Sequence, residues 1–325
     1  MHPAFSVIFL TTLIGVGQGL FLALFMGQFY SAAQFLPSEV SHNFYSTGSL
    51  IALLFLVAGL ISSIFHLGHP ERAWRSAAKW RTSWLSREVI ALPMTMGIIF
   101  VYGVMQYMGW DFVIFTTSTG AQLTLSLVVA GVGAMLVLAL FVCTAMIYAC
   151  IKFLQEWSSP LTVINYFLLG SASGFTLATA FSSTTEPELL NFYGGFAVAL
   201  TVMALLFRSA SLYRNGRIKY KSSIQSAIGV RHNTIVQLAQ GAMGGSFNTR
   251  EYFHGKSAFF LKSIKYIFLI LVFPVPLVLL VVGLESGSSA SLILAFVIQY
   301  AGLVAERWFF FAQANHPQNI YYQTI

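Results

Sequence analysis

"FYSTGSLIALLFLVAGLISSIFHLGHPERAWRSAAKWRTSWLSREVIALPMTMGIIFVYGVMQYM", residues 44–108, places one short charged segment between two long apolar runs. Each run supplies the about 20 helical residues that are needed to cross a hydrocarbon layer of about 30 Å. The segment between them, residues 67–88, holds five cations and three tryptophans, which suit the interface between membrane and water. This alternation predicts two membrane-spanning helices that are joined by a polar connection.

The same alternation runs through the whole chain. Of its 325 residues, 57% are hydrophobic and 8% are charged, and the mean hydropathy is +0.76. These values lie far from those of soluble domains. Apolar windows long enough to span a membrane occur at 4–31, 44–66, 89–108, 121–151, 159–181, 191–212, 263–284 and 288–312. We therefore predict an all-α polytopic membrane protein, an eight-transmembrane-helix bundle that forms one domain over residues 1–325.

The charges predict the orientation of this bundle. With eight helices, the connections 67–88, 152–158 and 213–262 fall on one side together with both termini. All 17 Lys and Arg lie in these segments or in the helix ends beside them. The opposite loops contain no cation and hold Glu39, Asp111, Glu186, Glu188 and Glu285. Because cytoplasmic loops are enriched in Lys and Arg, we expect both termini and the long 213–262 loop to be cytoplasmic, in a bacterial inner membrane.

The net charge of +7 is therefore interpreted as a one-sided positive field. A field of this kind attracts anionic membrane lipid or a partner protein. We expect no nucleic-acid partner.

The positions of the histidines and cysteines argue against a redox metal in this chain. A membrane b-type haem usually takes two histidines that face each other inside a helix bundle. All seven histidines lie at predicted helix ends, in loops or near the termini: His2, His42, His66, His69, His232, His254 and His316. Two cysteines, Cys143 and Cys150, are too few for an iron–sulfur cluster. We therefore predict no haem, no cluster and no metal site.

Four ionisable residues lie at or just before the ends of apolar windows. They are Glu88, Arg208, Glu306 and Arg307. We predict that they lie near the cytoplasmic interface, within reach of water and lipid headgroups. A transporter with a charged site at the membrane midplane is therefore disfavoured, whereas one for neutral substrates stays open.

The connection between the second and third helices is a candidate quinone site. We expect His66 to end the second helix, Ser86 to cap the third, and Glu88 to lie in its first turn, near His66. Histidine donates or accepts protons at physiological pH, and a carboxylate relays a second proton, as quinone chemistry requires. The alternative is structural: both residues merely interact with helix macrodipoles. On the residues alone, both interpretations stay open.

Several stretches resemble the membrane-anchor subunit of the dimethyl sulfoxide reductase family. They are "HPAFSVIFLTTLIGVGQGL" (2–20), "HLGHPERAW" (66–74), "SREV" (86–89) and "AERWFFFAQANHPQNIYY" (305–322). The resemblance implies an anchor without a redox metal that exchanges electrons with a quinone, either ubiquinone or menaquinone. It implies an iron–sulfur electron-transfer subunit and a molybdopterin catalytic subunit as partners. On the matching positions it implies His66 and Glu88 as quinone-site residues, Arg72 as a supporting donor and His69 as a more distant candidate.

The resemblance also implies that the iron–sulfur subunit docks on the side of the 67–88 connection. The charge pattern makes that side cytoplasmic, as in the sulfite-oxidising branch of the family, which the N-terminal stretch also resembles. We therefore predict the anchor of a cytoplasm-facing sulfite:quinone oxidoreductase. Three alternatives stay open: a quinol-oxidising anchor of a sulfoxide-type reductase, a transporter, and an inert structural anchor.

Overall fold

The computed structural model describes residues 1–36, 40–118, 120–220, 223–236, 238, 252–317 and 319. Glu39 and much of the predicted cytoplasmic loop, residues 239–251, lie outside these ranges. Within the described ranges, eight spans are helical, long and apolar enough to cross a membrane. The predicted eight-helix bundle of an integral membrane protein is therefore confirmed in its helix number.

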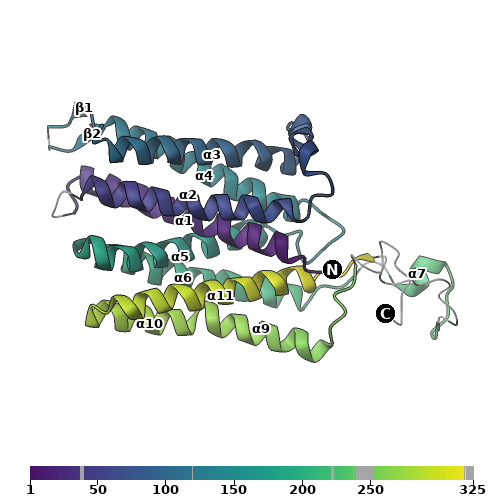
Figure 1. Cartoon of the computed structure of the whole chain (residues 1–325). Coiled ribbons are helices and arrows are strands. Elements are labelled where there is room, and N and C mark those ends of the chain that lie inside the picture. The colour runs from purple at the N-terminus through teal and green to yellow at the C-terminus, as the bar shows by residue number, and fades with distance from the viewer. Residues whose placement is uncertain are drawn as a thin grey trace.

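The spans run side by side in one bundle (Figure 1). They are α1 (Phe5–Ala32), α2 (His42–Ile64), α3 (Trp84–Tyr107), α4 (Leu125–Ala149), α5 (Pro160–Thr185), α6 (Leu190–Asn215), α9 (Ala258–Val272) continued by α10 (Pro274–Ser286), and α11 (Ser289–Ala312). The short elements are η1 (Pro70–Lys79), η2 (Pro187–Leu189), α7 (Ile224–Ile228) and the strands β1 (Val113–Thr116) and β2 (Gln122–Thr124).

The start of α3 corrects one prediction. Ser83, not Ser86, caps the helix: its hydroxyl accepts the backbone N–H of Ser86 over 3.4 Å. An N-cap side chain satisfies one of the unpaired N–H groups of the first turn, so the helix begins directly after it, at Trp84. Glu88 is consequently the fifth helical residue and lies in the second turn, deeper in the bundle than predicted.

Two further features depart from the predicted helices. The seventh span breaks at Phe273, between α9 and α10. Pro274 has no backbone N–H to donate to a carbonyl of α9, so α9 ends before it and α10 begins at it. Between α3 and α4, β1 and β2 form an antiparallel hairpin where we expected a plain loop. The fold of the described residues is otherwise helical.

Close packing of α1 against α5 forms the centre of the bundle. Gly15 and Gly19 of α1 meet Gly170 and Gly174 of α5, and both pairs have the small-xxx-small spacing that lets membrane helices approach closely. A Cβ atom at Gly174 would lie 2.1 Å from the carbonyl carbon of Gly19, so no side chain fits there. As a result most of α1 is buried, and its polar residues face other helices instead of lipid.

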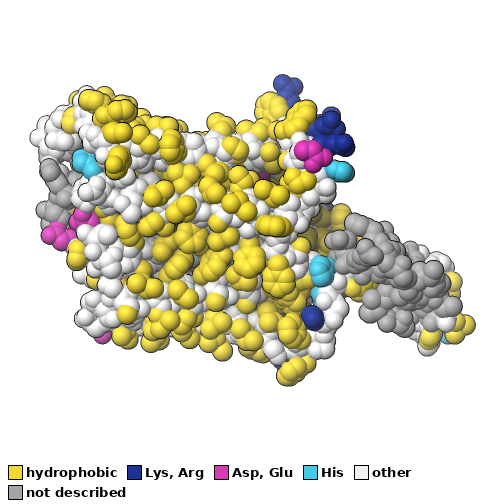
Figure 2. Space-filling model, viewed as in Figure 1, with side chains coloured by type: hydrophobic (Ala, Val, Ile, Leu, Met, Phe, Trp, Pro, Cys, Tyr) yellow, Lys and Arg dark blue, Asp and Glu magenta, His cyan; other side chains and the backbone are white. Residues whose placement is uncertain are grey.

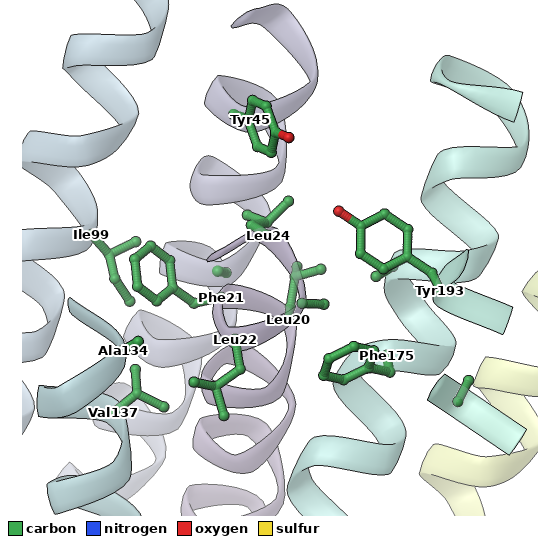
Figure 3. Close-up of a cluster of buried hydrophobic side chains, with 14 of the residues drawn as sticks. Leu20, Phe21, Leu22, Leu24, Tyr45, Ile99, Ala134, Val137, Phe175 and Tyr193 are labelled. Atoms are coloured by element: carbon green, nitrogen blue, oxygen red, sulfur yellow. The ribbon is translucent and has the colours of Figure 1, made fainter. Parts of the chain in front are cut away.

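Apolar side chains from several helices pack around the middle of α1 (Figure 3). Phe21 of α1 makes an edge-on contact with Tyr102 of α3, with ring centroids 5.6 Å apart. Tyr45 and Tyr193 point toward one another from α2 and α6. The labelled side chains belong to one continuous apolar cluster.

The two ends differ in charge. We call one the basic end; its described residues are 65–83, 150–159, 216–220, 223–236, 238, 252–257, 313–317 and 319. We call the other the acidic end; its described residues are 33–36, 40–41, 108–118, 120–124, 186–189 and 287–288. Residue 1 lies at the basic end, where the Met1 amino group donates to the Ala314 carbonyl over 2.7 Å. On the face shown in Figure 2, the Lys and Arg side chains lie at the basic end, and apolar side chains cover the flank.

Candidate functional site

The α2–α3 connection is held against the start of α3 by one arginine. The Arg87 guanidinium donates to the carbonyls of Trp80 and Arg81 over 2.9 and 2.8 Å. It also lies 4.2 Å from the centroid of the Trp84 ring, a cation–π contact. These contacts give the polar connection a defined position beside the bundle.

Three of the predicted site residues lie on this connection and are exposed. His66 follows the end of α2 by two residues, and partial desolvation lowers its pKa, so the ring is neutral at neutral pH. His69 Nδ1 and Arg72 Nε lie 3.1 and 3.7 Å from the same atom, Glu71 Oε1. Exposed pairs of this kind contribute about 1 kcal/mol or less. The sequence interpretation gave Glu71 no role.

The fourth predicted residue, Glu88, is buried in the bundle. Its side chain is 7% exposed, and Glu88 Oε1 accepts the hydroxyl of Thr144 from α4 over 2.6 Å. Within the part of the chain that the structure describes, no hydrogen bond or ion pair joins Glu88 to His66, His69 or Arg72. Three of the four predicted residues therefore form an exposed group on the connection. The fourth, Glu88, is a carboxylate inside the bundle next to that group.

A buried ion cluster joins α6 to α11. Arg208 Nε lies 2.8 Å from Glu306 Oε1, and Arg307 Nη1 lies 3.2 Å from Glu306 Oε2. Arg307 also stacks over the Tyr166 ring of α5 at 3.7 Å. All three charged residues are at most 4% exposed. The cluster carries one surplus positive charge.

This burial corrects the prediction that Glu88, Arg208, Glu306 and Arg307 are reached by water and headgroups. The sequence gives the depth of a residue along a helix, but not the face on which it projects. Here each side chain projects into the bundle, where a charge needs a partner. The two arginines form ion pairs with Glu306, and Glu88 accepts a hydrogen bond from Thr144.

A small cavity lies between these two buried groups, where α1, α4, α5 and α11 meet. Its volume is about 20 Å³, and its lining includes Thr144, Arg307, Tyr166 and Gln18. Thr144 thus connects Glu88 to the cavity, and Arg307 connects the ion cluster to it. Sequence reasoning missed Thr144, Tyr166 and Gln18; the available signal was polar residues within strongly apolar windows.

Side chains that could ligate a metal are dispersed over the described ranges. In those ranges, no group of three or more His, Cys, Asp or Glu side chains is placed to hold a metal ion. The expectation that this chain binds neither haem nor an iron–sulfur cluster stays a prediction.

Known proteins resemble the chain over its whole length. The family described as "DMSO reductase anchor subunit (DmsC)" matches residues 1–313. The C subunit of the sulfite dehydrogenase of Allochromatium vinosum is 56% identical over 325 residues, which cover 100% of both chains. Similarity therefore includes both the α2–α3 connection and the buried groups beside it.

Proposed function

The chain belongs to the DMSO reductase anchor subunit family, and from this premise we propose that it is the quinone-reactive anchor of a sulfite-oxidising molybdopterin and iron–sulfur complex. The full-length similarity to the C subunit of a sulfite dehydrogenase supports sulfite as the substrate of the complex. The observation that carries the quinone role is Glu88, a buried carboxylate beside an exposed, histidine-bearing connection at one end of the bundle.

The proposed quinone site lies between the end of α2 and the start of α3. Reduction of a quinone takes up two electrons and two protons, one on each carbonyl oxygen. His66 donates a hydrogen bond to one carbonyl and passes on a proton that the ring takes up from water at the exposed connection, and Glu88 supplies the proton for the other carbonyl. The exposed indoles of Trp74 and Trp80 suit the interface at which a quinone headgroup enters from lipid. His69 and Arg72, which share Glu71, support the outer side of the site.

The proposed partners bind at the basic end. An iron–sulfur subunit docks there and brings electrons from a molybdopterin catalytic subunit, so the chain itself needs neither haem nor cluster. Four cations of the connection lie at this end, beside lipid headgroups and the docked subunit: Arg72, Arg75, Lys79 and Arg81. By the positive-inside rule this end is cytoplasmic in the inner membrane.

The composition of the complex tests the anchor role. We expect mild-detergent purification through a tag on this chain to yield molybdenum and iron in a fixed ratio, and the preparation to reduce ubiquinone or menaquinone with sulfite. Glu88→Gln should abolish quinone reduction while sulfite oxidation with an artificial acceptor continues. An intact preparation without molybdenum and iron would contradict the anchor role and favour transport, which uptake of solutes into liposomes would reveal.

Labelling of introduced cysteines tests the orientation. Lys79→Cys at the basic end and Phe35→Cys at the acidic end are matched sites, because both native side chains are exposed. In intact cells, a membrane-impermeant maleimide should label only Phe35→Cys. Labelling of Lys79→Cys instead would place the catalytic subunits outside the cytoplasm.

The family match also favours a second candidate, electron flow in the opposite direction. The description of the matching family names dimethyl sulfoxide reductase. Reduction of dimethyl sulfoxide consumes electrons, whereas oxidation of sulfite releases them. The same site would then oxidise a quinol and pass protons away through Glu88. Quinol-dependent reduction of dimethyl sulfoxide by the purified complex, with no sulfite-dependent quinone reduction, would select this candidate.

A further inference from the structure

The cavity between Glu88 and the ion cluster carries unpaired hydrogen-bonding capacity. Gln18 Nε2 is buried in its lining and has no hydrogen-bond partner within the described residues. Arg307, also in the lining, has five N–H donors, and Glu306 Oε2 is its one ion-pair partner there. Leaving a buried donor unpaired costs about 1–3 kcal/mol. The cavity therefore offers donors to a polar occupant.

The same cavity also offers acceptors. Thr11 and Ser173 line it, and their hydroxyl protons are directed to carbonyls of their own helices, Val7 O over 3.0 Å and Gly170 O over 2.9 Å. Their oxygen atoms therefore remain available to accept hydrogen bonds. An occupant that both donates and accepts fits this lining.

The volume limits what this occupant is. About 20 Å³ exceeds the roughly 10–15 Å³ that one water molecule needs, whereas a quinone headgroup has far more atoms than this space holds. Water also needs two to four polar partners, and the lining supplies donors and acceptors in that number. The cavity is therefore suited to water.

Thr144 connects such a water to Glu88. Its hydroxyl proton is directed to Glu88 Oε1 at 2.6 Å, so Thr144 Oγ1 is left to accept a hydrogen bond from the cavity side. The two hydrogen bonds would then run in the same direction, from the cavity to the carboxylate. This is the arrangement along which a proton moves toward Glu88.

We propose that a water molecule held in this cavity by Gln18 and Arg307 passes protons through the Thr144 hydroxyl to Glu88. The water gives a proton to Thr144 Oγ1 as the hydroxyl proton moves to the Glu88 carboxylate. The hydroxide that is left beside the Arg307 guanidinium takes up a proton that enters from bulk water at the basic end, which restores the water, and no electron moves. The assignment of the quinone as the final acceptor rests on the proposed function; the site itself rests on the cavity.

The charges around Glu88 are compatible with this role. The ionisable groups with which it interacts within the bundle are Cys143 and Tyr148 of α4 and Tyr166 of α5. Tyr148 and Tyr166 interact with Arg307 as well, and the Arg307 guanidinium lies 3.7 Å over the Tyr166 ring. Arg87, on the same helix as Glu88, is bound to the connection. Arg307 thus supplies positive charge in the lining of the cavity to which Thr144 connects Glu88.

Kinetics of the whole complex test the relay. Thr144→Val removes the hydroxyl at nearly constant shape, and Thr144→Ser keeps it. We expect Thr144→Val to lower sulfite-dependent quinone reduction about 10- to 100-fold, with a larger solvent isotope effect and a changed pH profile, because proton delivery becomes limiting. Thr144→Ser should restore turnover. Artificial-acceptor turnover, which bypasses Glu88, should not change.

Infrared spectroscopy gives a readout that does not depend on activity. The carboxyl band of Glu88, identified by its loss in Glu88→Gln, should shift in Thr144→Val and also in Gln18→Met, because both changes break the chain to the water. If the band shifts in Thr144→Val but not in Gln18→Met, the proposed water is wrong, and Thr144 is only a direct hydrogen-bond partner of Glu88.

The outcomes also separate this inference from the proposed function. If Glu88→Gln stops quinone reduction while Thr144→Val and Gln18→Met keep the wild-type rate and isotope effect, only the relay is wrong. If Glu88→Gln retains quinone reduction, the proposed quinone site is wrong as well.

Discussion

Helix α1 carries two buried glutamines, one near its middle and one toward the acidic end of the bundle, and the two differ in their partners. Gln28, toward the acidic end, donates to Ser126 over 2.6 Å and accepts from Tyr102 over 2.9 Å. Ser126 in turn donates to Asp111 over 2.6 Å. Gln18, near the middle of α1, has an amide nitrogen that is unpaired within the described residues, and it lines a cavity.

The difference indicates separate roles for the two regions. A buried polar network with its hydrogen bonds formed stabilises one packing arrangement, and here it joins α1, α3 and α4 at the acidic end. Unpaired buried donors are uncommon in native proteins and call for an explanation by function or by bound water. Gln28 and its partners thus stabilise the bundle, whereas Gln18, on the proposal above, holds the water of the relay.

The largest expected effect comes from the ion cluster. Glu306→Gln leaves Arg208 and Arg307 without their shared carboxylate, and breaking a buried pair costs about 3–5 kcal/mol. We expect little assembled complex in the membrane and a sharply lowered melting temperature in detergent. The matched change at the acidic end is Asp111→Asn, in which a half-buried residue keeps its shape, and it should cost clearly less. Equal losses of stability in the two variants would contradict the view that charged groups matter more for stability in the ion cluster than at the acidic end.

The two glutamines give the next largest effect and the sharpest comparison. Gln28→Leu removes both hydrogen bonds and leaves Tyr102 and Ser126 short of partners, which should destabilise the bundle by about 1–3 kcal/mol. Quinone turnover per folded complex should stay as in the wild type. Gln18→Met should show the reverse, a small change in melting temperature with slowed turnover. A turnover defect in Gln28→Leu alone would reverse the roles assigned here.

A smaller effect is expected from the pH dependence of His66. Desolvation lowers its pKa below the ordinary value of about 6.5, so the neutral ring is lost only as the pH falls below that value. Because the protonated ring still donates a hydrogen bond and can also give a proton, quinone reduction should rise as the pH falls through this lowered pKa. His66→Gln should be slower and should lack this rise in a pH titration of turnover. If the turnover of His66→Gln has the same pH dependence as that of the wild type, another group titrates.

The smallest effect is expected on the exposed connection. Glu71→Gln removes the shared partner of His69 and Arg72, yet all three residues are exposed, so stability should change by less than about 1 kcal/mol. Thermal melting of the purified complex measures this change. A loss as large as that of Glu306→Gln would show that the connection, too, stabilises the bundle.

Sequence reasoning predicted the spans well because membrane helices need about 20 apolar residues and connections between them carry the charges. It selected Glu88 from a short motif at a helix start, but placed it one turn too shallow, because Ser83 and Ser86 are equally good caps in sequence. The break at Pro274 was missed because prolines are tolerated inside membrane helices.

The cavity was not predictable in the same way. It depends on which face of α1, α4, α5 and α11 turns inward, and α1 is apolar on almost all sides, so no polar stripe marks Gln18. Thr144 likewise lies in a continuous apolar run, and hydroxyl residues are common in such helices. Only the packing of α4 against α3 shows that its hydroxyl meets Glu88.

The central claim is that Glu88 delivers protons to a quinone, and one ratio tests it most directly. Sulfite oxidation by the purified complex is measured with a quinone and with an artificial acceptor, for Glu88→Gln and for Asp111→Asn as the control at the opposite end. We expect Glu88→Gln to lower the ratio of quinone to artificial-acceptor turnover about 100-fold or more, and Asp111→Asn to leave it unchanged. A wild-type ratio in an assembled Glu88→Gln complex would contradict the claim.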